Sequence, residues 1–465
     1  MKVIIIGGGA AGLFCAGKLT QAGADVTIIE HSKETGLKIL VTGKGRCNVT
    51  NDCDEETFLK NVRTNPKFLY SAIYGFPPSA TMTFFENLGV RLKTERGRRV
   101  FPVSDNAGEI KQALEKYAGK AKIIYDNATG LVFDGDRVAG VKLAGGKILY
   151  ADKVVVATGG LSYKQTGSTG DGYKFAKEAG HKVVTPTASL VPLVENGSVC
   201  RRMMGLSLKN VNLTIKNGKK ELFSEQGEML FTHFGISGPL VLSASCHIKD
   251  SDVQKCVAVI DLKPALSEET LYKRICTDFE KLAVKQASNS LDLLLPKSMI
   301  DVVLDRWGND REKKVNQITK EERHRLVKLL KNFTIPLNSK YKIDVAVITS
   351  GGVSTKEINP ATMESKIKKD LYFIGEVIDV DRYTGGYNLQ IAFATAYACG
   401  SGIAENIKVW RIYYDLFRSV RRPRRSRQKH NSKRNSKAKK HSICGHRRHV
   451  PCHRPVYALQ RYRHK

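Results

Sequence analysis

Three glycines near the start of the chain have the spacing that a phosphate-binding turn requires. Gly7, Gly9 and Gly12 form G-x-G-x-x-G directly after a short apolar run. Gly7 permits the tight turn out of a strand, Gly9 lets the backbone approach a pyrophosphate, and Gly12 lets helix and strand pack closely. Glu30 ends a second apolar run 18 residues beyond Gly12, where an acid can bind a ribose 2′-hydroxyl. The pattern predicts a dinucleotide site at the N-terminus of a helix over residues 11–22.

A second segment, far along the chain, decides which dinucleotide is expected. Glu30 disfavours the 2′-phosphate of NADP, which leaves FAD or NAD. Residues 371–379 have the pattern of a strand ending in glycine and acids, and a helical run over 391–399 follows. The acids Glu376 and Asp379 can meet a ribityl chain, and the helix can direct its positive end at a flavin pyrimidine ring. NAD alone does not need this segment, so FAD is the predicted cofactor.

The segment from Lys38 to Asn51 resembles the K-x-L-x-[ST]-G-x-G-R-C-N-x-T-N signature of the BaiN-like (YhiN-like) flavoproteins, also described as NAD(P)/FAD-dependent oxidoreductases or the aminoacetone oxidase family. Lys164 departs from the family pattern, which has proline there. Similar blocks follow in family order at 157–160, 167–172, 227–239, 350–353, 363–366 and 375–390. The resemblance implies an α/β fold: a Rossmann-type FAD-binding domain of glutathione-reductase type, split by an inserted β-rich and helical substrate domain.

The fingerprint and the resemblance together predict one set of cofactor-binding residues. Arg46 and Asn48 are expected to hold phosphate and ribityl groups. The resemblance implies that the backbone near Val132 pairs with the adenine. The whole set is Gly7, Gly9, Ala11, Gly12, Glu30, Lys38, Gly45, Arg46, Asn48, Val132, Thr158, Gly159, Gly375, Glu376, Asp379, Gly386, Asn388 and Gln390.

Candidate catalytic residues are few. His233 lies in the glycine-rich segment 227–239 of the expected substrate domain, where it can protonate a substrate that receives a hydride from flavin N5. Its ring can equally serve to satisfy loop carbonyl groups. Glu228 and Tyr387 are weaker candidates of the same kind. The 11 histidines show no convincing metal spacing, so no metal site is predicted.

Cys47 and Cys53 suggest a rival chemistry, because disulfide reductases carry a redox C-x4-C pair facing the flavin. Here the spacing is C-x5-C, and no second G-x-G-x-x-G for a nicotinamide domain follows. Cys47 is therefore interpreted as a packed loop residue. NAD(P)H remains the expected electron donor.

Charge and composition narrow the class of protein. The formal net charge is +31, and residues 409–465 contribute 19 Lys and Arg against one Asp. The rest of the chain is also basic. This charge can attract a polyanion such as RNA, or it can simply reflect a lysine-rich surface; no RNA-binding signature is visible. Ten cysteines without disulfide spacing and the lack of an 18-residue apolar run predict a cytoplasmic enzyme that does not enter a membrane.

Four regions are expected along the chain. Residues 1–187 and 342–407 would form the FAD-binding domain, and 188–341 the inserted substrate domain. Within the first part, the short strands and turns of residues 122–158 are expected to form a small antiparallel meander, from which strand 153–158 returns to the main sheet. In the insertion, strands are expected at 211–215 and 256–261 and helices at 268–280, 297–307 and 320–331, the last preceded by a Thr319–Glu322 capping box.

Residues 408–465 are predicted to be a disordered, non-native basic tail. Codons for Ser426–Lys433, moved by one base, can spell Ala-Gly-Lys-Ser-Thr-Ile-Ala, part of a phosphate-binding loop. Codons for Cys444–Pro451 in the same frame can spell Val-Asp-Thr-Gly-Ala-Met-Tyr-Arg. Both strings resemble the start of bacterial cytidylate kinases, so a frameshift or lost stop is inferred. A genuine RNA-binding tail is the alternative.

Taken together, the residues predict an FAD-dependent oxidoreductase. The favoured reaction is hydride transfer from NAD(P)H through flavin N5 to a conjugated C=C bond, in a steroid-like enone or in a uracil of RNA. The alternatives are an amine or aminoketone oxidase that uses O2, and a flavin-containing RNA-binding protein without catalysis. The oligomeric state is left open.

Overall fold

The computed structural model describes residues 1–381 and 385–420, with side chains described as far as residue 407. The chain divides into two compact units, Met1–Tyr413 and Tyr414–Lys465. The long helix α13 (Tyr387–Val420) continues beyond residue 408, so the prediction of a disordered tail was wrong for residues 408–420. Residues 421–465, which hold the predicted frameshift strings, lie outside the described residues.

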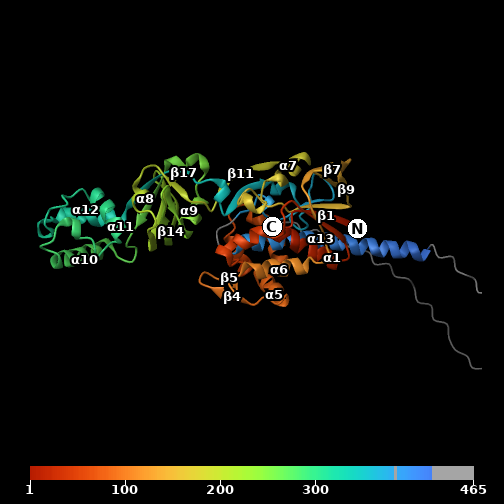
Figure 1. Ribbon diagram of the computed structural model, residues 1–465, viewed down its shortest axis with the longest axis horizontal. Coiled ribbons are helices and arrows are strands. Elements are labelled where there is room, and N and C mark those ends of the chain that lie inside the picture. The colour runs from red at the N-terminus through yellow and green to blue at the C-terminus, as the bar shows by residue number, and fades with distance from the viewer. Residues whose placement is uncertain (382–384, 421–465) are drawn as a thin grey trace, which may run out of the picture. The chain divides into compact units, whose positions relative to one another are not determined.

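A five-stranded parallel sheet forms the base of the first part of the chain (Figure 1). All four residues of β10 are buried, as are four of the five in β1, because helices cover both faces of such a sheet. Its order places β1 at the centre, so the connections diverge at the carboxyl ends of the strands, where ligands bind in this type of sheet. The strands in order are β6 (Lys122–Tyr125), β2 (Asp25–Glu30), β1 (Lys2–Ile6), β10 (Lys153–Val156) and β19 (Leu371–Phe373).

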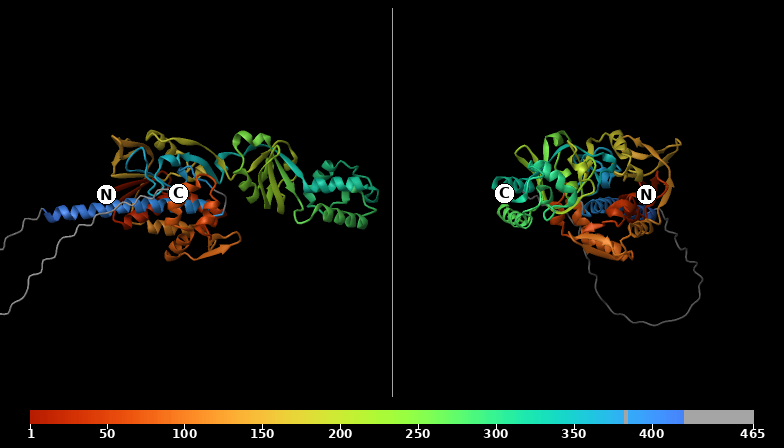
Figure 2. Two further views of the ribbon diagram at one scale, coloured as in Figure 1. Left: turned by 180° about the vertical axis from the view of Figure 1, so that it is seen from behind. Right: turned by 60° about the vertical axis from the view of Figure 1, so that its left-hand side comes forward.

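Aromatic side chains hold the helices on this sheet. The ring of Phe14 on α1 (Ala10–Gln21) lies 5.1 Å from that of Phe76 and 5.7 Å from that of Phe393 on α13. Figures 1 and 2 show α13 running alongside the N-terminal part of the chain. The other helices of this region are α2 (Leu37–Val41), α3 (Glu55–Lys60), α4 (Tyr70–Gly75), α5 (Pro78–Asn87), α6 (Ala107–Tyr117) and α7 (Asp171–Glu178).

Two small sheets accompany the parallel sheet. One orders β3 (Thr50–Asn51), β5 (Arg99–Pro102) and β4 (Leu92–Glu95). The other is an antiparallel meander of β7 (Ala128–Asp134), β8 (Arg137–Leu143) and β9 (Ile148–Tyr150). The prediction of a meander from residue 122 was wrong for β6, which pairs with β2 in parallel. A short strand has the same pattern in either pairing, so its partner is decided by tertiary contacts.

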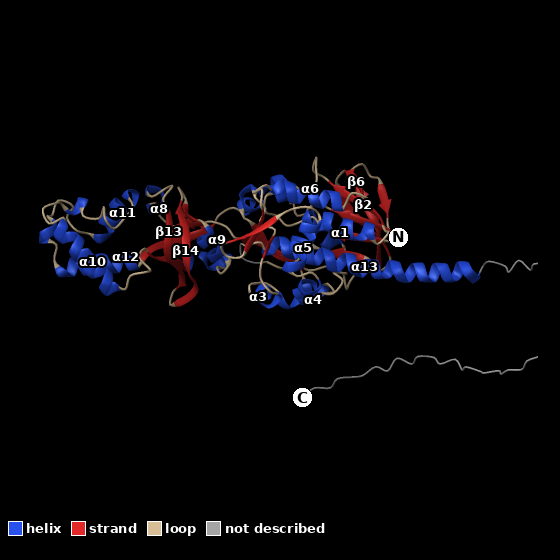
Figure 3. Ribbon diagram, turned by 90° about the horizontal axis from the view of Figure 1, so that it is seen from below, coloured by secondary structure: helices blue, strands red, loops and turns tan. Residues whose placement is uncertain are grey.

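The inserted region has its own core, separate from that of the parallel sheet. A closed barrel orders β12 (Leu193–Glu195), β15 (Gly235–Ser237), β14 (Lys220–Phe231), β13 (Ser207–Asn217), β16 (Cys256–Asp261) and β17 (Phe333–Lys340). Figure 3 shows its strands in red beside a helical group in blue. The helices are α8 (Val199–Arg202), α9 (Pro239–Ser245), α10 (Glu268–Lys281), α11 (Lys297–Trp307) and α12 (Lys320–Lys331).

One strand of the barrel comes after the helices. β17 follows α12 directly and closes the barrel by pairing with both β12 and β16. An antiparallel pair, β11 (Val183–Ser189) with β18 (Ile348–Val353), flanks the insertion in the sequence. No helix among the described residues is both long enough and apolar enough to cross a membrane.

Candidate cofactor-binding and active site

The three glycines of the first turn have three different surroundings. Gly7 has φ +104°, and a Cβ there would lie 2.6 Å from the carbonyl oxygen of Ala157. A Cβ on Gly12 would lie 2.0 Å from the carbonyl oxygen of Gly7, so only glycine lets α1 pack this closely on the turn. A Cβ on Gly9 would meet nothing within 4 Å. Gly9 therefore leaves space for a ligand, whereas the other two allow the backbone to pack.

The N-terminus of α1 is open to an anion. No side chain caps the helix at Gly9, and its first turn has no acidic residue. The first N–H groups of a helix lack partners within the helix, and the helix dipole adds positive potential there. This end of α1 therefore has the properties of a phosphate site.

Glu30 ends β2 beside this turn, as predicted. Its side chain is buried, and its two carboxylate oxygens accept hydrogen bonds from the backbone N–H groups of Gly8 and Ser32 at 2.7 and 2.8 Å. Each carboxylate oxygen has a second lone pair, so the group can still accept bonds from ribose hydroxyls. Glu30 is thus held in a fixed orientation.

A polar cluster lies at the other end of the site. Lys38 Nζ donates to Glu376 at 2.6 Å and to Ser162 Oγ at 2.7 Å, and the N–H of Thr349 donates to Glu376 at 2.9 Å. Four segments distant in sequence therefore meet at Glu376. The ion pair fixes both predicted residues, so a ligand here meets a neutral pair rather than a free carboxylate.

The loop containing Arg46 and Asn48 is held by protein groups. Arg46 makes two hydrogen bonds to Glu95 at 2.9 and 3.3 Å and one to Asp105 at 3.2 Å, and its guanidinium lies 4.1 Å from the ring centre of Phe101. These contacts, above all that to Glu95, raise the pKa of Arg46 and lower that of Glu95. A phosphate bound by Arg46, as predicted, would therefore share its guanidinium group with two carboxylates.

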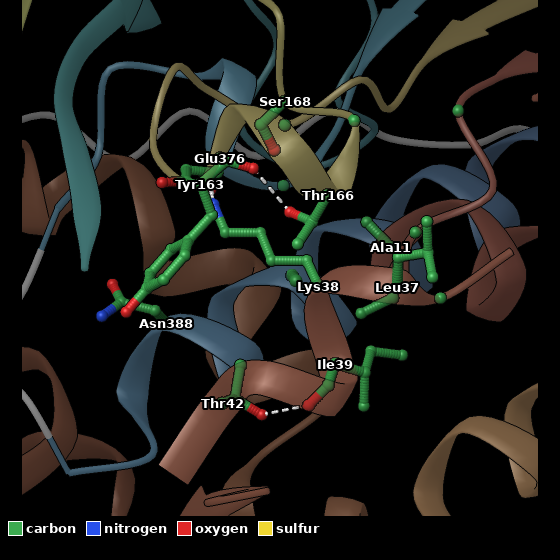
Figure 4. Close-up of a pocket in the computed structure, with 18 of the residues that line it drawn as sticks. Ala11, Leu37, Lys38, Ile39, Thr42, Tyr163, Thr166, Ser168, Glu376 and Asn388 are labelled. Carbon is green, nitrogen blue, oxygen red and sulfur yellow. Dashed lines mark hydrogen bonds and ion pairs between the residues drawn. The ribbon is translucent and has the colours of Figure 1, made fainter. Parts of the chain in front are cut away.

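These elements line a large cavity of about 1020 Å³. It extends from the glycine turn and Glu30 to Asn388 at the start of α13, and Figure 4 shows part of its lining. The predicted cofactor residues that line it are Gly7, Gly9, Ala11, Glu30, Lys38, Arg46, Asn48, Thr158, Gly159, Gly375, Glu376, Gly386 and Asn388.

Five predicted cofactor residues do not line the cavity. Gly12 packs against the turn, and Gly45 and Val132 lie outside the lining, which passes instead through residues 126–129. Asp379 accepts a hydrogen bond from Asn65 at 3.1 Å, and burial raises its pKa. Gln390 is buried and bonded to Thr50, Thr81 and the carbonyl group of Phe76.

His233 does not line the cavity either. It is exposed in the short turn between β14 and β15, where its ring lies edge-on against Phe234. Glu228 and two other residues of the inserted region do line the cavity. Among the described residues, no cluster of three His, Cys, Asp or Glu side chains could hold a metal ion.

Tyr163 is a cavity residue that the sequence analysis did not select. Its backbone has φ +54°, which a tyrosine rarely adopts. Figure 4 shows its side chain pointing toward Asn388, at the end of the cavity where α13 begins. Tyrosines are common, and only the structure shows that this one has an unusual conformation and a hydroxyl directed into a cavity.

Cys47 is fully buried, and burial raises the pKa of its thiol to about 12. A thiol with so high a pKa is protonated at neutral pH and is a poor nucleophile. It does not line the cavity. These properties agree with a packed loop residue and disfavour a dithiol redox centre.

The cavity fits FAD by its own groups. Three groups line it in turn: the N-terminus of α1, which can bind phosphate, Glu30, which can bind ribose, and the start of α13, whose first turn has no acidic residue. In its wall, Thr158 Oγ1 is buried and has no hydrogen-bond partner among the described residues, and a bound ligand can supply one. The fold and the site define a flavoprotein with a Rossmann-type FAD-binding domain.

Comparison with known proteins supports a Rossmann-type FAD-binding domain. Residues 1–402 match the family model of the HI0933-like protein Rossmann domain. The chain is 30% identical over 416 residues to a 3-dehydro-bile acid delta(4,6)-reductase of Clostridium scindens, covering 87% of this chain and 99% of the relative. It is 34% identical over 408 residues to a ribosomal RNA dihydrouridine synthase of Haemophilus influenzae, covering 86% and 98%. The Escherichia coli protein of the same name is 31% identical over 405 residues, covering 86% and 97%.

The chain therefore belongs to the HI0933-like family, and it is an FAD-dependent oxidoreductase. This confirms the resemblance inferred from the Lys38–Asn51 signature.

Proposed function

We propose that the protein uses electrons from NAD(P)H to saturate a C=C bond conjugated to a carbonyl group. The observation that carries this proposal is the shared chemistry in the names of two relatives. Reduction of a delta(4,6) bile acid and formation of dihydrouridine differ in substrate but both saturate such a bond. Both relatives match this chain over nearly their whole length, so the same cavity is available for the same type of reaction.

The cavity residues have separate tasks in this reaction. Bound FAD supplies a hydride acceptor and donor, at N5 of its ring system. The open start of α1 and Glu30 hold the pyrophosphate and ribose, and the start of α13 favours negative charge on the pyrimidine ring. The second carbon of the substrate bond must then receive a proton from an acid within hydrogen-bond reach.

Two residues are candidates for that acid. His233 has the suitable chemistry but is exposed outside the cavity lining. The hydroxyl of Tyr163 points toward Asn388, and no described residue is its hydrogen-bond partner. We assign the proton to Tyr163 and keep His233 as the competing assignment.

Separate measurement of the two half-reactions tests the function and the assignment together. NAD(P)H should bleach the flavin, and an enone or a uracil-containing RNA should reoxidise it faster than O2 does. Tyr163→Phe keeps the ring, so FAD content and reduction by NAD(P)H should remain normal while reoxidation by the C=C acceptor slows by roughly 10²-fold or more. His233→Asn is the matched control, with reoxidation close to that of the wild type.

The opposite pattern, in which reoxidation is slow in His233→Asn and normal in Tyr163→Phe, would assign the proton donor to His233. If NAD(P)H never bleaches the flavin and no acceptor reoxidises it, the reductase proposal fails. Rapid reoxidation by O2 together with an amine substrate would favour the oxidase alternative. If Cys47→Ser retained FAD but lost turnover, the dithiol mechanism would become the favoured hypothesis.

A further inference from the structure

A group of exposed cations surrounds part of the cavity opening. Lys44 and Arg99 line the cavity and are exposed, so they lie where it opens to solvent. Arg96 and Arg98 are exposed in the turn that joins β4 to β5, next to Arg99. We call these four residues the basic rim.

The basic rim differs from the other cations of the cavity in its pairing. Of the five Lys and Arg side chains in the lining, Lys38, Arg46 and Lys174 are ion-paired with Glu376, Glu95 and Asp171. Lys44 and Arg99 have no ion pair with any acid in the described part of the chain, and the same holds for Arg96 and Arg98.

Two acids beside the basic rim are already engaged by other cations. Glu95 and Asp105 bind Arg46, and Lys93 Nζ lies 2.7 Å from Asp105. The hydrogen bond from Lys93 lowers the pKa of Asp105, and that from Arg46 lowers the pKa of Glu95. Glu95 and Asp105 therefore pair with Arg46 and Lys93 and not with the basic rim, where Arg98 interacts electrostatically with Asp54 without forming an ion pair with it.

The position of the basic rim is fixed by the backbone. Asn51 Nδ2 donates to the carbonyl oxygens of Gly97 and Gly385, each at 3.0 Å, which ties the β4–β5 turn to the segment before α13. Lys44 and Arg98 have φ of +60° and +57°, an unfavourable conformation for these residues. Such strain persists only where the surrounding structure holds it in place.

We propose that the basic rim binds successive phosphates of a single-stranded RNA segment while one base enters the cavity. The proposal rests on the function proposed above and selects RNA as the substrate class. Four unpaired cations spread over a loop and a hairpin are more than one phosphate group requires, whereas a nucleic-acid strand presents a row of phosphates. A uracil ring can reach a buried cavity only when it is unstacked, as in a single strand.

Binding of a fluorescein-labelled oligouridine to the full chain at increasing salt tests this without turnover. The double variant Arg96→Gln/Arg98→Gln should bind roughly tenfold more weakly at physiological salt. The slope of log K against log salt should fall by about 0.7 for each lost phosphate contact. The matched control is Lys219→Gln/Lys220→Gln, which removes two exposed charges at the β13–β14 hairpin tip that have no ion pair within the described part of the chain.

The basic C-terminal residues are present in every variant, so they add the same background to each measurement. FAD content and thermal unfolding should match the wild type for both pairs, since all four side chains are exposed. Equal slopes for the two variant pairs would overturn the proposal. It would also be overturned if the rim variant weakened only NADPH, because the ligand would then be a dinucleotide phosphate. Weaker RNA binding in a protein whose flavin no acceptor reoxidises would keep the basic rim and reject the reductase.

Discussion

Helix α1, which begins at the cavity, differs from α10 and α12 of the inserted region in how its first N–H groups are satisfied. In the insertion, Ser267 caps α10 by accepting a bond from the N–H of Thr270, and Thr319 and Glu322 form a complete capping box on α12. At the cavity, the N-cap residue of α1 is Gly9, which has no side chain to cap the helix. α10 and α12, which support a core, have side-chain caps at their first turns, whereas α1 leaves its first N–H groups for a ligand.

Two glycines of the cavity turn, Gly9 and Gly12, also differ in whether they serve the ligand or the packing of the protein. Gly12 is needed by the protein, because any Cβ would collide with the carbonyl oxygen of Gly7. Gly9 has open space around it and an extended backbone, with φ −79° and ψ −169°, that other residues can adopt. The one glycine serves packing and the other serves the cofactor, although both belong to the same motif.

The largest effect is expected from Gly12→Val. Its side chain would force α1 away from the β1 turn, which should lower the free energy of unfolding by at least about 3 kcal/mol and abolish FAD binding. Chemical denaturation of the apoprotein and flavin absorbance measure the two effects. A stable variant that binds FAD would show that α1 can shift freely, and the division between the two glycines would be lost.

Gly9→Val should separate the cofactor from the fold. The side chain would occupy the space left for the pyrophosphate, so FAD affinity should fall by roughly a hundredfold, about 3 kcal/mol. The apoprotein should lose no more than about 1 kcal/mol of stability, because the extended backbone accepts valine. Reconstitution of apoprotein with FAD, followed by fluorescence quenching, gives the affinity. Retention of tightly bound yellow cofactor would contradict the assignment of this space.

The smallest effect is expected in the inserted region. Thr319→Ala removes the cap of α12 and should cost about 1 kcal/mol of stability, with FAD affinity unchanged. Thermal unfolding and flavin titration on the same preparation test both statements. A loss of FAD affinity would show that the core of the insertion and the cofactor cavity are coupled, so that α12 and α1 would not have separate roles.

Much of the fold follows from local pattern. The G-x-G-x-x-G turn, the apolar runs of β1 and β2, and the helices at 297–307 and 320–331 appear where the sequence predicted them. The Thr319–Glu322 capping box is also present. These features depend on residues within one or two turns of each other, so the sequence contains the interactions that form them.

The roles of several charged and polar residues could not be predicted in this way. Arg46 has the pattern of a phosphate ligand, yet Glu95 and Asp105 share its charge. Gln390 was predicted to bind the cofactor, yet Thr50 and Thr81 engage it in the core. In each case the deciding partner comes from a distant part of the chain, and charge and hydrogen bonding depend on that partner rather than on residue type.

The sequence by itself determined the class of cofactor, because the glycine turn, the following helix and Glu30 form one local unit whose backbone geometry suits a dinucleotide. Only the tertiary structure decided which groups face the cavity. It directed Tyr163 into the cavity and left His233 outside its lining. It also neutralised Arg46 while leaving the basic rim unpaired. The physical reason is that a side chain's chemistry depends on its solvent exposure and its neighbours, and both are set when separate segments pack together.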